Sequence, residues 1–185
     1  ATSLELSSLA EVFGTLAVTG NATLQSLDIS SLQDAMGLTI QNNAELTTLG
    51  NWTALQFIYG SLTIDSNPAL TALDVATTSS SDGTVGTAFR VDGTLTITNN
   101  KALADIGVFD YLQFAGQVVV SNNSSLDYCT EAREVGCCVP SAAEATITGN
   151  KGTSSSSNCG GHSWCYVANG DACNNDYSGY SGQVK

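Results

Sequence analysis

One short segment has the residue types and spacing that metal chemistry requires. Cys159, His162 and Cys165 are separated by two residues each, and cysteine with histidine is the usual donor set of a zinc site. However, neither a paired Cys-x2-Cys nor a His-x3-His motif elsewhere completes a tetrahedral site. The segment therefore favours disulfides beside an exposed His162, and we predict neither a metal nor another cofactor.

Carboxylates are the second set of side chains that could do chemistry. Asp65 with Asp92 or Glu45 could provide the paired acids that general acid and base catalysis needs. Because the chain has 17 acidic residues against five Lys and Arg, scattered acids are more simply a solvated surface. The single histidine and the lack of a Gly-x-Ser-x-Gly motif argue against nucleophilic hydrolysis. We predict that the protein is not an enzyme and has no catalytic residues.

The charge balance excludes several classes of partner. A formal net charge of -12 disfavours nucleic acid, whose binding requires clustered cations, and also anionic lipid. Hydrophobic residues make up 42 % of the 185-residue chain, which is too many for a disordered acidic tail. No apolar run approaches the roughly 18 to 20 residues of a membrane span, so membrane insertion is not expected.

Cysteine and sequon content predict a secreted protein. The six cysteines are an even number within Ser, Gly and Asn-rich sequence, which is typical of disulfides formed in an oxidising compartment, with 15 possible pairings. Four Asn-x-Ser/Thr sequons agree with a eukaryotic secretory route. We expect an extracellular or cell-surface protein whose signal peptide has been removed. The disulfide candidates are Cys129, Cys137, Cys138, Cys159, Cys165 and Cys173.

An internal repeat dominates the first 150 residues. Its copies are LAVTGNATL (16–24), LTIQNNAEL (38–46), LTIDSNPAL (62–70), LTITNNKAL (95–103), VVVSNNSSL (118–126) and the shorter ATITGNK (145–151). One Asn aligns in every copy, at spacings of 22, 24, 33, 23 and 27 residues, so insertions lie between copies. A solenoid tolerates length changes in this way, because its stacked strands are constrained and its connecting loops are not.

The Leu-Thr-Ile alternation predicts a strand with one buried face in each copy. Leu38 and Ile40 should point inward and Thr39 outward, with further inward residues three and six positions after the aligned Asn. The Gly that closes several coils is expected to relieve backbone strain. The aligned residues should form an internal asparagine ladder, comprising Asn21, Asn43, Asn67, Asn100, Asn123 and Asn150.

The predicted architecture is all-β, a right-handed β-solenoid of about six coils with a disulfide-rich loop cap. The solenoid should span residues 1–150, and the Cys-rich cap and tail residues 151–185. The pattern GxLTIxNNxxLxxL resembles the receptor L-domain group of leucine-rich β-solenoids over residues 4–150. That family occurs in growth-factor receptor ectodomains and in fungal sporulation and cell-wall surface proteins. The resemblance implies a cell-surface protein, with a ligand-binding ectodomain as one alternative.

The outward strand face carries two columns rich in small hydroxyl side chains. Such an array could bind a partner, carry O-linked sugar or bind ice, although Thr is also simply a good strand residue. The candidates are Thr39, Thr63, Thr96, Thr98, Thr146 and Thr148. The N-glycosylation candidates are Asn51 and Asn122, whereas Asn21 and Asn123 should be buried in the ladder and unmodified.

The start of the sequence lies in mid-coil. Leu6-Ser-Ser-Leu9 matches the second half of a repeat, but no strand and Asn precede it. Residues 1–13 could fold over the first coil as a cap, or the surface there could be completed by another molecule. We therefore expect a structural or interaction module of a cell surface, matrix or filament. Its expected partners are covalent glycans and proteins, including its own copies arranged head to tail.

Overall fold

The computed structural model describes residues 1–50, 52, 54–73, 89–107, 112–127 and 145–151. These ranges contain nine strands: β1 (Ser3–Glu5), β2 (Glu11–Thr19), β3 (Ser26–Asp28), β4 (Asp34–Gln41), β5 (Phe57–Ile58), β6 (Leu62–Asp65), β7 (Phe89–Thr98), β8 (Leu112–Ser121) and β9 (Ala145–Thr148). Among the described residues, no helix has the length and apolar character needed to cross a membrane.

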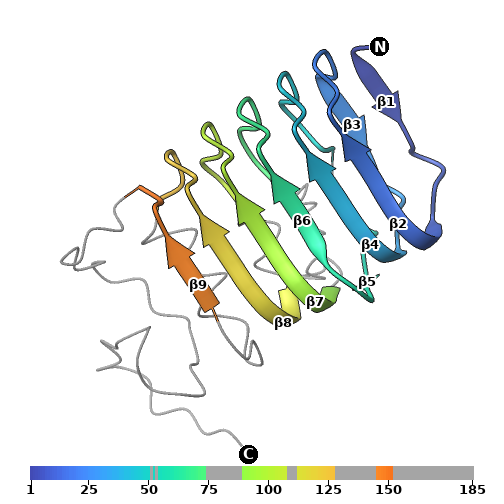
Figure 1. The fold of residues 1–185 in the computed structure, drawn as a ribbon. Coiled ribbons are helices and arrows are strands. Elements are labelled where there is room, and N and C mark those ends of the chain that lie inside the picture. The colour runs from blue at the N-terminus through green and yellow to red at the C-terminus, as the bar shows by residue number, and fades with distance from the viewer. Residues whose placement is uncertain (51, 53, 74–88, 108–111, 128–144, 152–185) are drawn as a thin grey trace, which may run out of the picture.

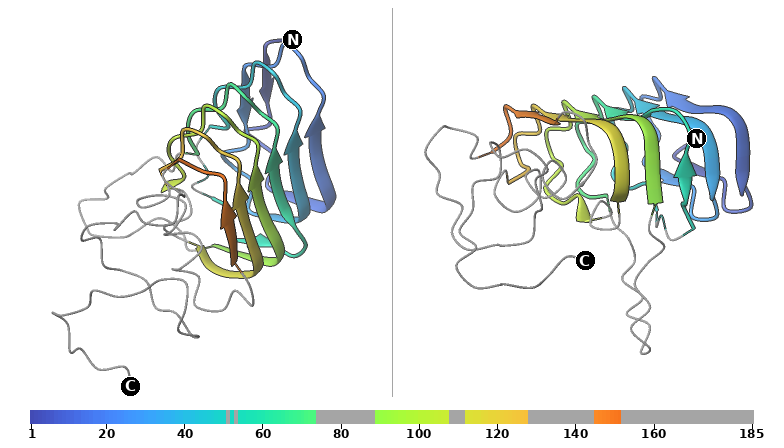
Figure 2. Two further views of the ribbon diagram at one scale, coloured as in Figure 1. Left: turned by 60° about the vertical axis from the view of Figure 1, so that its left-hand side comes forward. Right: turned by 90° about the horizontal axis from the view of Figure 1, so that it is seen from below.

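The strands stack in parallel along one axis, as Figures 1 and 2 show. A seven-stranded sheet has the order β2-β4-β5-β7-β8-β9, with β6 between β4 and β7, and a second sheet pairs β1 with β3. Single bridges such as Ser26 with Thr48 and Ala72 with Asp105 continue the second side. Because every strand pairs with the equivalent strand of the next coil, the predicted β-solenoid is confirmed.

The core is formed by the inward residues of each coil, as the alternation predicted. Leu38 and Ile40 are fully buried, and their equivalents in β6, β7 and β8 are also 0 % exposed. The residues three and six positions after the aligned Asn line another side of the core. In this set every described member is at most 4 % exposed: Leu24, Leu27, Leu46, Leu49, Leu70, Leu73, Leu103, Ile106 and Leu126.

A row of glycines lies where the long strands bend, because the neighbouring coil leaves no room there for a side chain. A Cβ at Gly60 would lie 2.3 Å from the Met36 carbonyl oxygen, and one at Gly116 would lie 2.6 Å from that of Asp92. Neither residue has a positive φ, so the prediction that these glycines relieve backbone strain is wrong. They are small because the backbones of successive coils approach closely at this corner.

Residues 1–13 do not fold across the end of the stack, so the expected cap is replaced by a partial coil. The strand β1 pairs in parallel with β3, from Ser3 with Ser26 to Glu5 with Asp28. β2 then pairs with β4, which makes β2 the first strand of the large sheet. The apolar residues here, including Leu6, Leu9 and Leu16, are only partly buried. This end of the solenoid core is therefore open in the structure.

Several predicted features lie outside the described residues. They include all six cysteines, Asn51, His162 and residues 152–185. The disulfide-rich cap and its boundary therefore stay predictions.

Candidate functional site

The aligned asparagines stack on one another from coil to coil. Asn43 donates its backbone N–H and its Nδ2 to the Oδ1 of Asn67, each at 3.1 Å. Asn67 makes the same two bonds to Asn100, at 2.9 and 3.3 Å, and its Nδ2 also donates to the Ile40 carbonyl at 3.0 Å. The pattern continues from Asn100 to Asn123 and from Asn123 to Asn150.

This asparagine ladder supplies hydrogen bonds to the polar groups that are buried in each turn. Asn43, Asn67, Asn100 and Asn123 are fully buried, where an unpaired amide would cost about 1–3 kcal/mol. Each side chain supplies an acceptor to one neighbouring coil and donors to the backbone and the other neighbour. The ladder therefore joins consecutive coils with buried hydrogen bonds.

A second backbone geometry recurs in every turn and was not predicted from the sequence. The residue before each ladder Asn has a positive φ: 71° at Gly20, 57° at Asn42, 56° at Ser66, 59° at both Asn99 and Asn122, and 69° at Gly149. Gly and Asn are the residues that adopt this left-handed conformation most readily. The available signal was the first Asn of the repeated Asn-Asn pair, which sets the backbone while the second forms the ladder.

The ladder ends at an open surface beside Asn21. Asn21 donates its backbone N–H and its Nδ2 to the Oδ1 of Asn43, at 3.1 and 3.0 Å, and no described residue donates to its own Oδ1. Asn21 is exposed, so the prediction that it would be buried is wrong. Among the described residues it is the outermost member of the ladder, and none of them forms a further coil stacked on it.

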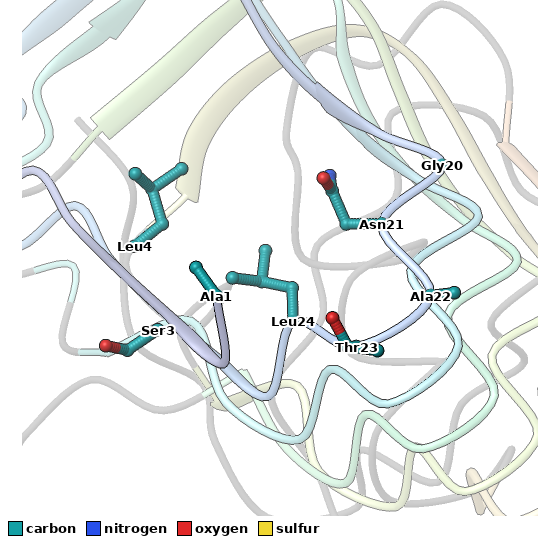
Figure 3. A pocket seen from close by; sticks show the side chains of 8 residues that line it. All are labelled: Ala1, Ser3, Leu4, Gly20, Asn21, Ala22, Thr23 and Leu24. Atoms are coloured by element: carbon teal, nitrogen blue, oxygen red, sulfur yellow. The ribbon is translucent and has the colours of Figure 1, made fainter.

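The open end is hollowed. A depression of about 370 Å³ lies between the start of the chain and the first turn. Figure 3 shows Leu4 and Ala1 on one side of it, Asn21 on the other and Leu24 at its base. This surface offers an amide oxygen and the partly covered apolar side chains of the first coil.

The outward face over the second half of each long strand carries the predicted Thr columns. One column pairs Ala17, Thr39, Thr63, Thr96, Val119 and Thr146 in register; the other pairs Thr19, Gln41, Asp65, Thr98, Ser121 and Thr148. Thr146 and Thr148 are exposed, and Thr39, Thr63, Thr96 and Thr98 are half-buried. The six candidate threonines therefore share one face, although Gln41 and Asp65 interrupt the second column.

Asp65 organises a polar cluster on this face. Its carboxylate accepts hydrogen bonds from Thr98 Oγ1 at 2.5 Å, Asn99 Nδ2 at 2.7 Å, Gln41 Nε2 at 2.8 Å and Ser66 Oγ at 3.0 Å. Partial burial alone would raise the pKa of Asp65, but these four donors outweigh it and hold the pKa below its ordinary value of 3.8. Asp65 is thus an ionised acceptor that links three adjacent strands.

This cluster predicts an acid-dependent loss of stability. Because the pKa of Asp65 is lower in the folded protein, its contribution is complete above pH 3.8 and falls as the pH drops through the lower folded pKa. Asp65→Asn should lower the free energy of unfolding at pH 7 by about 1 kcal/mol and flatten this part of its pH dependence. Urea titrations of both proteins between neutral and acidic pH would measure it. A parallel pH dependence in the two proteins would contradict the assignment.

The other two candidate acids have different surroundings from those of Asp65. Asp92 Oδ1 lies 2.6 Å from Arg90 Nη2 in an ion pair, and Glu45 is exposed. Within the described ranges, no group of three or more His, Cys, Asp or Glu side chains could hold a metal ion. Asp65 itself is already occupied by four neutral donors, which suits a structural role.

The first half of the long strands carries an apolar surface that the sequence analysis missed. Phe13 is 87 % exposed, Met36 50 %, Phe57 38 % and Tyr59 50 %. We call these four residues the aromatic strip. They flank inward residues that are paired in register, Val12 with Ala35 and Ala35 with Ile58. Alternation along the strands was a usable signal, because it places residues on both sides of a buried position on the outer face.

Rings and charges extend the aromatic strip across the next coils. The Phe57 and Tyr59 rings are stacked, with centroids 5.8 Å apart and planes at 15°. Arg90 pairs with Phe57 in the strand register, and its guanidinium carbon lies 4.5 Å from the centre of the Phe114 ring. The result is a band of flat side chains running along the solenoid axis.

The chain matches no protein-family model, no curated protein and no solved structure. The resemblance to the receptor L-domain group therefore stays at the level of sequence pattern, and the structure shows the broader class, a β-solenoid.

Proposed function

We propose that this protein is a non-enzymatic, extracellular glycoprotein that acts as a rigid structural or interaction module. The observation that carries the proposal is the continuous buried ladder from Asn43 to Asn150. It lies beside a core in which most inward side chains of the inner coils are 0 or 1 % exposed. Because the interior is filled, the outer faces and the open end are the surfaces that can contact partners. Stacked coils hold those surfaces in fixed positions.

Covalent sugar is the first kind of partner in this proposal. Asn122 is exposed, whereas the overlapping sequon at Asn123 is fully buried and its Nδ2 donates to Ile97 O and Asn150 Oδ1. A branched glycan does not fit inside a packed coil, so Asn122 is the acceptor and Asn123 is not. The exposed hydroxyls of Thr146 and Thr148 are accessible to O-linked sugar.

The second kind of partner is protein, including other copies of the chain. The edge strand β2 has one charged residue, Glu11 at its start, and neither charge nor proline from Val12 to Thr19. Charges and prolines are the usual protection of an edge. Together with the hollow beside Asn21, this supports end-to-end contact. A heterologous contact grows into a fibre when its rotation does not close a ring.

The test is to isolate native material and measure its assembly state by light scattering and electron microscopy, before and after enzymatic deglycosylation. Peptide mapping on the same samples would locate the sugars. The proposal predicts a glycan at Asn122 and none at Asn123. The protein is then either a glycosylated monomer or a subunit of fibres. Unmodified protein with free thiols would contradict the extracellular assignment, and glycan on Asn123 would contradict the ladder register.

Ice binding is a second candidate, supported by the in-register run of Thr39, Thr63 and Thr96 on adjacent strands. Strands in a sheet are about 4.8 Å apart, so these hydroxyls form a regular row. If the row binds ice, the protein should show freezing hysteresis, and Thr96→Tyr should abolish it by raising a bulky ring above the face. Thr146→Tyr, outside the run, is the matched control. A protein without hysteresis would remove this candidate.

A further inference from the structure

We propose that the aromatic strip, Phe13, Met36, Phe57 and Tyr59, is a binding site for a neutral polysaccharide lying along the solenoid axis. This inference rests on the proposed function, since it names a ligand for a module that works through its outer surface.

The first observation is where the exposed apolar side chains gather. Among the described residues, five large hydrophobic side chains are exposed, and four of them form the aromatic strip. Three successive coils contribute to it, through β2, β4 and the segment from β5 to Tyr59. On a chain of net charge -12, a gathered apolar patch of this kind marks a contact surface.

The second observation is that the backbone projects these side chains outward. The pairing of β2 with β4 shifts between Val12 and Thr15, so Phe13 and Gly14 together oppose Met36. Such a bulge re-aims a side chain, and Phe13 is the most exposed large side chain of the set. Further along, the Phe57 and Tyr59 rings are stacked on each other, so each ring helps to hold the other in place at the surface.

Flat rings bordered by carboxylates suit a sugar chain. The C–H faces of a pyranose pack on an aromatic ring, and its hydroxyls donate to carboxylates. The same outward columns contain Glu11 and Asp34, which are paired in register, and Asp34 is next to Phe57 on the adjacent strand. Glu11 is exposed and Asp34 is half-buried, so carboxylate acceptors border the rings.

Charge selects a neutral ligand over an anionic one. The outward columns carry the carboxylates of Glu11, Asp34 and Asp92, and the single cation, Arg90, is already paired with Asp92 and placed over Phe114. Anionic glycans and anionic lipid surfaces would be repelled. Strands repeat about every 4.8 Å along the axis. An extended chain of sugar rings lying along that axis can therefore contact an outward side chain of each successive coil.

The experiment measures retention of the purified full-length chain on insoluble cellulose, chitin, β-1,3-glucan and mannan, with a sulfated polysaccharide for comparison. We expect retention on at least one neutral polymer and none on the sulfated one. Tyr59→Ala should weaken binding about tenfold, as expected for loss of one stacked ring, while Tyr59→Phe should retain it. Thr63→Ala, on the other half of the outer face, is the matched control.

Phe13→Ser is a second variant whose folding is not in question, because that side chain is 87 % exposed, and it should also weaken binding. Absence of retention on every neutral polymer would overturn the proposal, as would equal retention of Tyr59→Ala and the parent. Variants that change light scattering but not polysaccharide retention would show that the aromatic strip is a contact between copies. Failure here leaves the proposed function intact, because that function is tested separately by glycan mapping and assembly state.

Discussion

Asn67→Ala should lower the free energy of unfolding by about 3–5 kcal/mol, the largest effect expected of any single substitution in the solenoid. The change removes the acceptor of the Asn43 backbone N–H and Nδ2, and it removes the donor to the Ile40 carbonyl. All these groups lie in a fully buried turn, so water does not replace the lost bonds. Chemical denaturation of both proteins would measure the difference.

Asn21→Ala is the matched control for this substitution. Asn21 occupies the same position of the repeat but is exposed at the open end, and its backbone N–H would still donate to Asn43 Oδ1. We expect a loss below about 1 kcal/mol. Similar costs for the two variants would mean that the ladder contributes no more in the interior than at its solvated end.

Gly60→Ala should destabilise the protein by about 2–4 kcal/mol, although alanine is only one methyl group larger. The added Cβ would lie 2.3 Å from the carbonyl oxygen of Met36, which is backbone and cannot rotate away. Relieving the clash would separate two coils next to the hydrogen bond from Gly93 N–H to the Gly60 carbonyl, which is 2.8 Å long. Thermal and urea unfolding would report the loss.

Gly14→Ala is the corresponding control, because Gly14 lies at the same bend in the first coil. A Cβ there meets nothing within 4 Å, and its φ is not positive. The substitution should be neutral or stabilising by about 0.5 kcal/mol, through the smaller entropy of the unfolded chain. If Gly60→Ala were tolerated equally well, close approach of the coils would not explain the glycine row.

The repeat made most of the fold predictable. Strand positions, inward residues and the stacked asparagines follow from alternation and from one aligned residue, because every coil must satisfy the same packing and hydrogen-bonding needs. The ladder register was predictable to the residue. Its boundary was not, since burial of Asn21 depends on whether a further coil covers it and not on the repeat itself.

The surface features were harder to predict because they depend on side-by-side placement of different coils. Phe13, Met36 and Tyr59 are far apart in sequence, and only the strand register brings them together. The role of Asp65 likewise needs Thr98 and Asn99, more than 30 residues away, to supply its donors. The glycine row was recognised, but its cause is contact between backbones and not local conformation.

The central claim is that the described coils form one rigid stack held by the asparagine ladder, so that the outer surface does the work. Hydrogen exchange of the ladder amides, followed by nuclear magnetic resonance, tests it most directly. The backbone amides of Asn43, Asn67, Asn100 and Asn123 should exchange slowly and at a common rate, while that of the exposed Asn21 exchanges faster. Rapid exchange at Asn67 or Asn100, or a different opening rate for each coil, would contradict the account.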